Sequence, residues 1–411
     1  MTDAFYPLKG GISHHLVSLC KSFQGKSDEL YVFNPYYKGN RIFDNLMVSI
    51  KELNLNTQLL KYLLISFYKV LKDKALKFNE KLKIIFHLIH NPRNLLIVIN
   101  NLATILPTLR TLNVDILVGG FPSNTLPLVF LLSRILNKKV VVFVYGNDFL
   151  IKNNILDRAF HFKTPYFKQA DKIVVLGKTT KYFFHKIHKI DEKDIEIFPL
   201  AIFPEDYRVE KSKEELRKKY NIDNESFVLL SVGWHVPRKK FDLVIKAVKT
   251  IKVERPDIRI KYLSVGEGIS SNYLKELASS LNLKNEVEFF GECANNVRNE
   301  LYKLSDLFVM PSITTNDSLE GFGLVFLEAN YHKVPVIGAY AGGVRDAVSN
   351  NETGLLVKPD DLGDLIDKIL FFIDNKNKRV ELGELGYQRV INKFLWTTRH
   401  QDFIEILRRL V

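Results

Sequence analysis

The stretch from Asp317 to Glu328 reads DSLEGFGLVFLE and has the order of a loop that turns into a helix. Glu320 and Glu328 enclose two glycines and the start of an apolar run, in the order Gly321, Phe322, Gly323, Leu324. Glycines beside a helix start let a ligand approach the backbone, and the free N–H groups of a first helical turn favour a phosphate. An acid at each end of such a site indicates hydroxyl groups to be held at each end.

The spacing of the two acids narrows the kind of ligand. If Glu320 and Glu328 lie along one helical segment, eight residues at about 1.5 Å each separate them by roughly 12 Å. A glycoside hydrolase needs its carboxyl pair about 5 to 9.5 Å apart. The pair therefore favours a grip on the two ends of a long ligand, such as a nucleoside diphosphate sugar. The plainer alternative is that Glu320 is an N-terminal helix acid and Glu328 a solvated helix residue.

The composition is that of an ordinary globular chain of about two domains, with 411 residues, 46% hydrophobic and 26% charged. No window reaches the roughly 18 uninterrupted apolar residues of a membrane span and no signal peptide opens the sequence, so we expect a cytoplasmic protein. The net charge of +13 favours an anionic partner: a nucleotide sugar, an anionic lipid headgroup or nucleic acid.

Residues 51–110 form a basic segment, with ten Lys or Arg against three Asp or Glu and therefore a net charge of +7. Aromatic and aliphatic residues run between the charges, which is the pattern of a basic amphipathic helix. Such a face can lie on the anionic inner surface of a membrane. The alternative is a solvated helix that packs its apolar stripe on a sheet, as most such helices do.

The start of the sequence carries Gly10 and Gly11 in a loop that precedes a helix-like run. In a doubly wound domain a glycine-rich loop of this kind follows the first strand and meets phosphate. Almost nothing precedes the loop here, so we predict that the first strand is missing and that translation was assigned to an internal methionine.

Nearly continuous apolar runs predict buried parallel strands in both halves of the chain. One of them, Val140 to Val144, is followed by Tyr145 and Asp148, at a strand's carboxyl end where open α/β sheets place ligands. Asp148 is a candidate for binding hydroxyl groups, and the alternative is that it caps a helix.

A second strand, Phe227 to Val232, is followed by a glycine and then by Arg238 and Lys239 at a helix start. Arg offers a fork of donors and Lys a point charge, so the two would clamp a diphosphate. The alternative is a solvated basic turn.

Several motifs together resemble one family. They are the run from Glu320 to Glu328, Val334 to Ile337, Gly342-Gly343 and Thr353 to Val357. They are similar to the nucleotide-sugar half of the family-4 glycosyltransferases, which are retaining enzymes with the GT-B fold. The likeness continues through nearly the whole chain.

The resemblance implies an α/β fold of GT-B architecture, with two Rossmann-like doubly wound domains facing a cleft. We expect an N-terminal acceptor-binding domain at 1–204, a C-terminal nucleotide-sugar domain at 205–390 and a helix crossing back at 391–411. By resemblance Glu328 holds the ribose hydroxyls, Glu320 lies near the transferred sugar, and Arg238 and Lys239 bind the donor phosphates.

The remaining implied donor-binding residues are Gly10, Gly11, Gly291, Gly321, Phe322, Gly323 and Leu324, and the implied catalytic residues are Glu320, Asp148 and Tyr145. The strand and turn at Gly291 resemble the segment whose backbone reads the base. Tyr145 stands where the family more often has a histidine, which puts a histidine-based role in doubt. Trp234 stands where an arginine often follows the glycine.

We therefore expect a retaining glycosyltransferase that moves a sugar from a nucleotide-diphosphate donor to a glycan or lipid-linked hydroxyl acceptor, in polysaccharide or glycolipid synthesis, with no metal. Three alternatives stay open. They are another GT-B activity, such as a nucleotide-sugar epimerase or a phosphorylase, an inactive homologue, and a nucleic-acid-binding protein. The last is disfavoured because the basic residues match no recognised RNA or DNA module.

Overall fold

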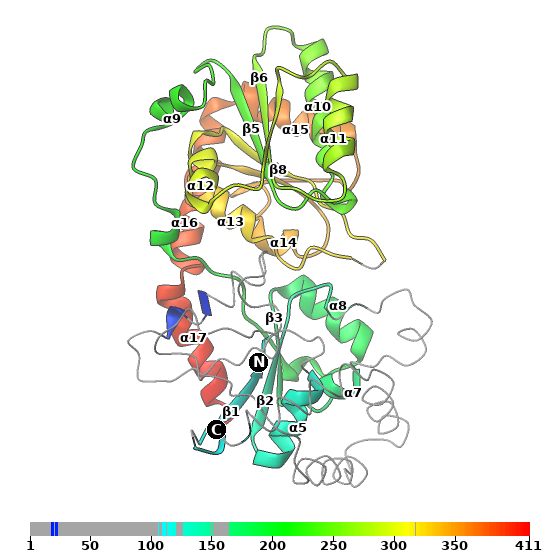
Figure 1. The fold of residues 1–411 in the computed structure, drawn as a ribbon, viewed down its shortest axis with the longest axis vertical. Coiled ribbons are helices and arrows are strands. Elements are labelled where there is room, and N and C mark those ends of the chain that lie inside the picture. Colours follow the sequence, from blue (N-terminus) through cyan, green and yellow to red (C-terminus); the bar gives the residue numbers. More distant parts are fainter. Residues whose placement is uncertain are drawn as a thin grey trace, which may run out of the picture. The chain divides into compact units, whose positions relative to one another are not determined.

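The computed structural model describes residues 18, 19, 21–23, 106, 109–111, 113–120, 126–148, 150, 164–316 and 318–411. The chain divides into two units, one of Met1–Pro199 with His400–Val411 and one of Leu200–Arg399 (Figure 1). Gly10, Gly11, the predicted absence of a first strand and all but three residues of the basic segment 51–110 lie outside the described residues.

The first unit contains a parallel sheet in the sequential order β1-β2-β3-β4. Its described strands are β1 (Ile116–Gly119), β2 (Lys139–Val144), β3 (Lys172–Val175) and β4 (Ile195–Ile197). Its described helices are α5 (Leu126–Leu136), α7 (Thr164–Phe167), α8 (Lys178–His188) and the 3-10 turn η1 (Glu192–Asp194). Strand β2 is buried in all but its first residue, as the continuous apolar run predicts.

The last helix, α17 (Trp396–Arg408), ends the chain in the first unit. The Phe403 ring lies 5.4 Å from the rings of both Phe143 and Phe198, measured between centroids. The His400 Nδ1 lies 3.1 Å from the Ser22 hydroxyl. Aromatic packing and a buried polar contact therefore attach the C-terminal residues to this unit.

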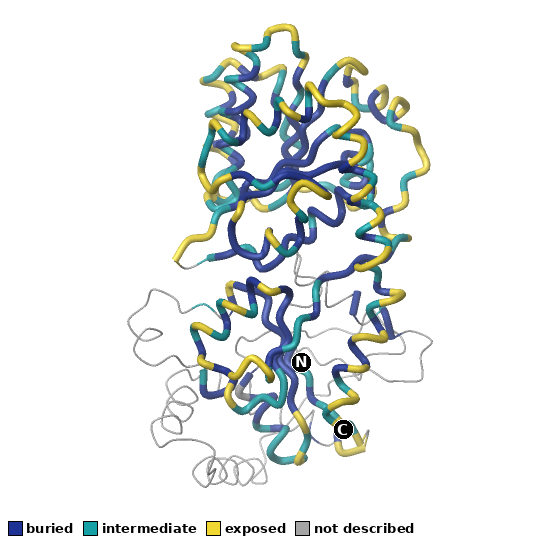
Figure 2. The backbone as a smooth tube through the Cα atoms, turned by 180° about the vertical axis from the view of Figure 1, so that it is seen from behind, coloured by how far each residue is buried: buried dark blue, intermediate teal, exposed yellow. Residues whose placement is uncertain are grey.

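The second unit is built on a six-stranded parallel sheet in the order β10-β9-β8-β5-β6-β7. Its strands are β5 (Phe227–Val232), β6 (Ile260–Val265), β7 (Val287–Gly291), β8 (Leu307–Met310), β9 (Val336–Ala339) and β10 (Gly354–Val357). Strands β5, β8 and β9 are buried along their whole length, and Figure 2 shows the strands beneath helices with exposed outer faces.

Helices cover both faces of this sheet, which is why its central strands are apolar throughout. They are α9 (Lys213–Lys219), α10 (Phe241–Glu254), α11 (Ser271–Ser280), α12 (Asn295–Leu304), α13 (Leu324–Tyr331), α14 (Val344–Ala347), α15 (Leu362–Asp374) and α16 (Lys376–Lys393). Two 3-10 turns, η2 (Pro204–Tyr207) and η3 (Pro237–Lys239), complete the unit. Helix α10 packs with α11 and α15, and α13 packs with α12 and α16 (Figure 1).

The strand order creates a switch point between β5 and β8. From β5 the chain moves outward through β6 and β7, and from β8 it moves the other way through β9 and β10. In open α/β sheets a crevice for ligands lies outside the carboxyl ends of the strands at such a point. A ligand site is therefore expected among the residues that follow β5 and β8.

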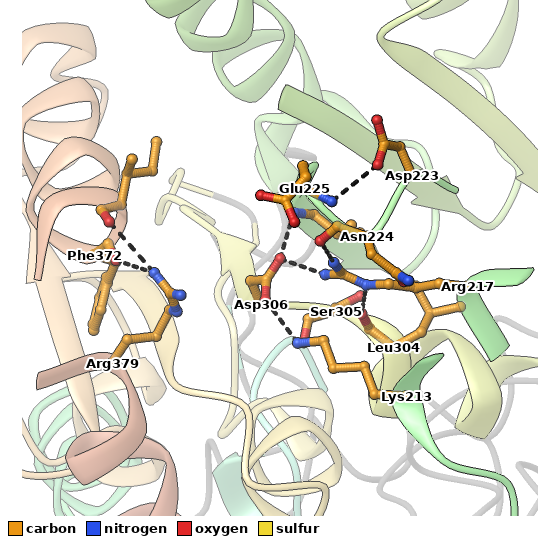
Figure 3. A network of polar contacts seen from close by, with 12 residues as sticks. Lys213, Arg217, Asp223, Asn224, Glu225, Leu304, Ser305, Asp306, Phe372 and Arg379 are labelled. Carbon is orange, nitrogen blue, oxygen red and sulfur yellow. Dashed lines mark hydrogen bonds and ion pairs between the residues drawn. The ribbon is translucent and has the colours of Figure 1, made fainter. Parts of the chain in front are cut away.

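A buried ion cluster lies at the opposite, amino end of β8 (Figure 3). Asp306 accepts hydrogen bonds from Lys213 at 2.7 Å, from Arg217 at 2.6 Å and from the Val228 amide at 2.8 Å. Burial alone would raise the pKa of Asp306, but attraction to Lys213 and Arg217 outweighs it and lowers the pKa. The stability gained from this carboxylate is therefore present at neutral pH and is lost as the pH falls through its lowered pKa.

Among the helices of the described part of the chain, none is both long and apolar enough to cross a membrane.

We predict that Arg217→Met lowers the free energy of unfolding of the second unit by about 3–5 kcal/mol, because it leaves a buried carboxylate without its closest cation. The chain has two tryptophans, Trp234 and Trp396, and both lie in this unit, so tryptophan fluorescence during urea unfolding reports on it alone.

The matched control is Arg259→Met, which breaks an exposed ion pair with Asp223 and should change stability little. Equal losses of unfolding free energy in the two variants would show that the Asp306 cluster stabilises the unit no more than an exposed ion pair does.

Candidate functional site

A compact charge cluster joins the ends of β5 and β8. Lys239 Nζ lies 2.5 Å from Glu320 Oε2, and Arg238 Nη1 lies 3.0 Å from the same oxygen. The three side chains are only 12%, 14% and 16% exposed. Arg238 and Lys239 come from η3 after β5, and Glu320 from the loop after β8. The alternative of a solvated basic turn is therefore wrong.

The two cations keep Glu320 ionised. Burial alone would raise its pKa, but attraction to Lys239 and Arg238 lowers the pKa to about 2. At neutral pH the carboxylate is an acceptor of hydrogen bonds and holds no proton to donate.

Backbone contacts fix the loop that carries Glu320. The Gly343 amide donates to the Glu320 carbonyl at 2.7 Å, and a Cβ at Gly343 would lie 2.0 Å from the Gly321 carbonyl oxygen. Any larger residue would push the two segments apart, so glycine is required here for close approach. On the other side the Ile313 amide donates to the Arg238 carbonyl at 2.9 Å and joins the two loops.

Helix α13 begins at Leu324, directly after Gly323, whose φ of 96° favours glycine. The backbone N–H groups of Gly321, Phe322, Gly323 and Leu324 donate no hydrogen bond to a described residue. Free amides at a helix start, beside two cations, make a site suited to an anion. The predicted loop-to-helix order around the glycines is thus observed.

Glu328 lies in the second turn of α13 and is 4% exposed. Its Oε1 accepts a hydrogen bond from the Tyr207 hydroxyl at 3.0 Å and its Oε2 from the Tyr302 hydroxyl at 2.8 Å. Arg298 Nε lies 3.7 Å from the same Oε2. These contacts hold a charged carboxylate in one orientation inside the unit.

Two expectations about the acid pair are corrected. Glu328 is not a solvated helix residue, because α13 is buried almost all round and its neighbours Leu327 and Ala329 are fully buried as well. Glu320 lies outside the helix, because the left-handed Gly323 separates it from Leu324. The estimate of roughly 12 Å along one helix therefore does not describe the pair.

Asp148 and Tyr145 lie in the first unit, in the turn after β2. The Asp148 carboxylate accepts hydrogen bonds from the amides of Tyr145, at 2.8 Å, and Gly146, at 2.6 Å. Both Asp148 and Tyr145 are 5% exposed. The carboxylate therefore organises its own turn, and the predicted roles of both residues in a reaction stay predictions.

The other predicted donor-binding residues differ in what they present. Phe322 is 1% exposed and packs its ring 5.9 Å from that of Phe394, so its side chain belongs to the core and its predicted donor contact stays a prediction. Leu324 is buried at the helix start. Gly291 ends β7, and its carbonyl accepts the Gly266 amide at 2.7 Å. Within the described residues no cluster of three or more His, Cys, Asp or Glu could hold a metal ion.

Sequence reasoning missed the side chains around Glu328. Tyr207, Tyr302 and Arg298 carry no motif, and the first of them precedes Glu328 by 121 residues. Only the fold brings them together.

Comparison with protein families finds one family that resembles most of the second unit. Residues 212–389, which include every site residue of the second unit except Tyr207, match the family described as glycosyl transferases group 1. This part of the second unit is therefore similar to the group 1 glycosyl transferases.

Curated relatives cover part of the chain. A GDP-mannose-dependent alpha-(1-6)-phosphatidylinositol monomannoside mannosyltransferase of Mycobacterium tuberculosis H37Rv is 29% identical over 217 residues, which are 52% of this chain and 56% of the relative. A trehalose synthase of Thermococcus litoralis is 26% identical over 245 residues, or 56% of this chain and 58% of the relative. The chain spans about half the length of the curated relatives it matches.

Solved glycosyltransferase structures share the fold at low sequence identity. Anabaena HepE in complex with UDP superposes with a TM-score of 0.66 at 19% identity, over 76% of this chain and 82% of that one. WaaG, a glycosyltransferase involved in lipopolysaccharide biosynthesis, superposes with a TM-score of 0.65 at 16% identity, over 97% and 96%. The predicted α/β fold class of GT-B architecture is confirmed.

We predict that Glu320→Gln lowers the stability of the second unit by about 3–5 kcal/mol at pH 7, because two buried cations lose their counter-charge. Pyrophosphate should stabilise the variant more than the wild type, since an added anion takes the place of the carboxylate. Thermal unfolding followed by tryptophan fluorescence measures both effects.

Glu384→Gln, which breaks an exposed pair with Lys333, is the control. Because the pKa of Glu320 is lowered to about 2, its stabilisation should fade between about pH 5 and pH 2 in the wild type and be missing from Glu320→Gln throughout. Equal pyrophosphate effects in the variant and the wild type would contradict an anion site at Lys239.

Proposed function

We propose that this protein is a retaining glycosyltransferase, which moves a sugar from a nucleotide-diphosphate sugar to a hydroxyl acceptor. The observation that carries the proposal is the convergence of Arg238, Lys239 and the free amides before α13 at the switch point of the second sheet. Two fixed cations and a helix start are what a diphosphate requires.

The donor nucleotide would lie along α13. The diphosphate binds Arg238, Lys239 and the amides of 321–324, and the ribose binds Glu328 further along the helix. A carboxylate has about four lone-pair sites, and the two tyrosine hydroxyls occupy two of those on Glu328. The two oxygens of a carboxylate suit the two neighbouring hydroxyls of a ribose.

The transfer would depend on electrostatics. As the bond between the sugar's anomeric carbon and the phosphate oxygen breaks, negative charge grows on the diphosphate, and Arg238, Lys239 and the amides stabilise it. The acceptor oxygen forms the new bond to the same carbon on the same face. The acceptor's proton passes to the departing phosphate, so no side chain needs to remove it.

Glu320 would hold hydroxyls of the transferred sugar and would not transfer protons. Its pKa of about 2 supports this role, because a group that is ionised across the working pH range makes a poor general acid. Its distance of 2.5 Å from Lys239 also ties its position to that of the phosphate-binding cation.

The acceptor we propose is a glycan or a lipid-linked sugar in cell-surface polysaccharide or glycolipid synthesis. Support comes from relatives named for phosphatidylinositol mannoside and lipopolysaccharide synthesis. The basic segment 51–110 would then meet the anionic membrane that carries such an acceptor. Trehalose synthases among the relatives favour a second candidate, transfer to a free sugar.

The test is a panel of UDP-, GDP- and ADP-sugars, with binding measured by calorimetry and nucleotide release measured with glycolipid or free-sugar acceptors. We predict that one donor binds and that Glu328→Gln weakens its binding at least tenfold, because the ribose loses a charged acceptor. Chelation of metals with EDTA should leave transfer unchanged, since the two cations supply the positive charge.

Glu288→Gln, on β7 and paired with Lys261, is the control that should bind like the wild type. Pyrophosphate, which lacks a ribose, should bind Glu328→Gln as well as the wild type, and this separates loss of the ribose contact from loss of folding. Binding of no donor by the wild type would contradict the proposed function.

A further inference from the structure

Arg298 on α12 has N–H donors that no described residue accepts. Its side chain is 20% exposed and its Nε is buried without a hydrogen-bond acceptor. None of its guanidinium nitrogens donates a hydrogen bond to a described residue. A largely buried arginine whose N–H donors reach no hydrogen-bond acceptor among the described residues is unusual, because buried polar groups in proteins are nearly always paired.

The one charged contact of Arg298 lies at the proposed ribose site. Its Nε is 3.7 Å from Glu328 Oε2, too far for a hydrogen bond but close enough for strong attraction. Attraction to Glu328 raises the pKa of Arg298, so the group stays positively charged.

Glu328 does not need Arg298 for its hydrogen bonds. Tyr207 and Tyr302 each donate to one of its oxygens, at 3.0 and 2.8 Å, and hold the carboxylate in place. The guanidinium therefore stands beside the carboxylate without a hydrogen bond to any residue that the structure describes, which leaves it able to meet a ligand.

The order of groups along α13 indicates which part of the nucleotide would meet Arg298. The phosphate-binding residues lie before Leu324, and Glu328 lies about 6 Å further along the helix. A ribose joins the phosphates at one end and the base at the other. Helix α12 packs beside α13 and brings Arg298 close to Glu328. Arg298 is therefore placed near the far end of the ribose, where the base is attached.

We propose that Arg298 binds the base of the donor nucleotide and selects bases that present a keto oxygen over bases that present an amine. This inference rests on the proposed function. Arginine has donors and no acceptor, so it pairs with the O6 of guanine or hypoxanthine or the O4 of uracil. It cannot pair with the exocyclic amine of adenine or cytosine, which is itself a donor.

The test compares matched nucleotides on the full chain. IDP and ADP differ at the 6-position of the purine, and UDP and CDP differ at the 4-position of the pyrimidine. In the wild type we expect the keto member of the better-binding pair to bind roughly tenfold or more tightly, as one good arginine contact allows. In Arg298→Met, which keeps the length of the side chain and removes its donors, the two members should bind about equally.

Lys303→Gln is the control, because it removes one positive charge from the same helix, and among the described residues Lys303 forms no ion pair with Glu328. It should keep the wild-type preference. Pyrophosphate binding checks that Arg298→Met is folded and retains its phosphate site.

The outcomes separate this inference from the proposed function. A preference for keto bases that is lost in Arg298→Met supports the inference. Equal weakening of all four nucleotides in Arg298→Met, with the preference unchanged, would show that Arg298 only supports Glu328 and would overturn it. Failure of every nucleotide to bind the wild type would overturn the proposed function and this inference together.

Discussion

The ion cluster of Lys239, Arg238 and Glu320 is the interaction on which the rest of the site depends. It joins the loop after β5 to the loop after β8, where the strand order of the sheet reverses. With most of each side chain buried, an unpaired charge here would be costly, so the two loops are held in one arrangement. The same cluster lies directly before the start of α13, where the amides of 321–324 donate no hydrogen bond to a described residue.

The second unit arranges this cluster and the Glu328 site along one helix. Gly343 fixes the position of the Glu320 loop through a hydrogen bond and a close backbone contact. Gly323 then starts α13, which carries Glu328 into a buried setting between Tyr207 and Tyr302. A ligand with negative charge at one end and hydroxyls further along matches this sequence of groups. Arg298 adds a further set of donors beyond them.

Sequence patterns predicted the local structure but not the residues, distant in the sequence, that contact Glu328. The strand predicted at Phe227 to Val232 is β5 with the same bounds, because a strand buried on both faces needs apolar residues nearly throughout. The glycines around Phe322 predicted the change from loop to helix. The burial of Glu328 was not predictable from a helical period, because α13 is buried almost all round and has no solvated face. The tyrosines that hold Glu328 come from η2 and α12 and leave no pattern near it.

We propose that Arg238, Lys239 and the amides before α13 bind the diphosphate of a nucleotide, and that Glu328 binds its ribose. The most direct measurement is a crystal structure of the protein with a nucleoside diphosphate. We expect phosphate oxygens within hydrogen-bond distance of Lys239 and of the amides of 321–324, and ribose hydroxyls at Glu328. A nucleotide bound elsewhere, with Lys239 still paired only to Glu320, would contradict it.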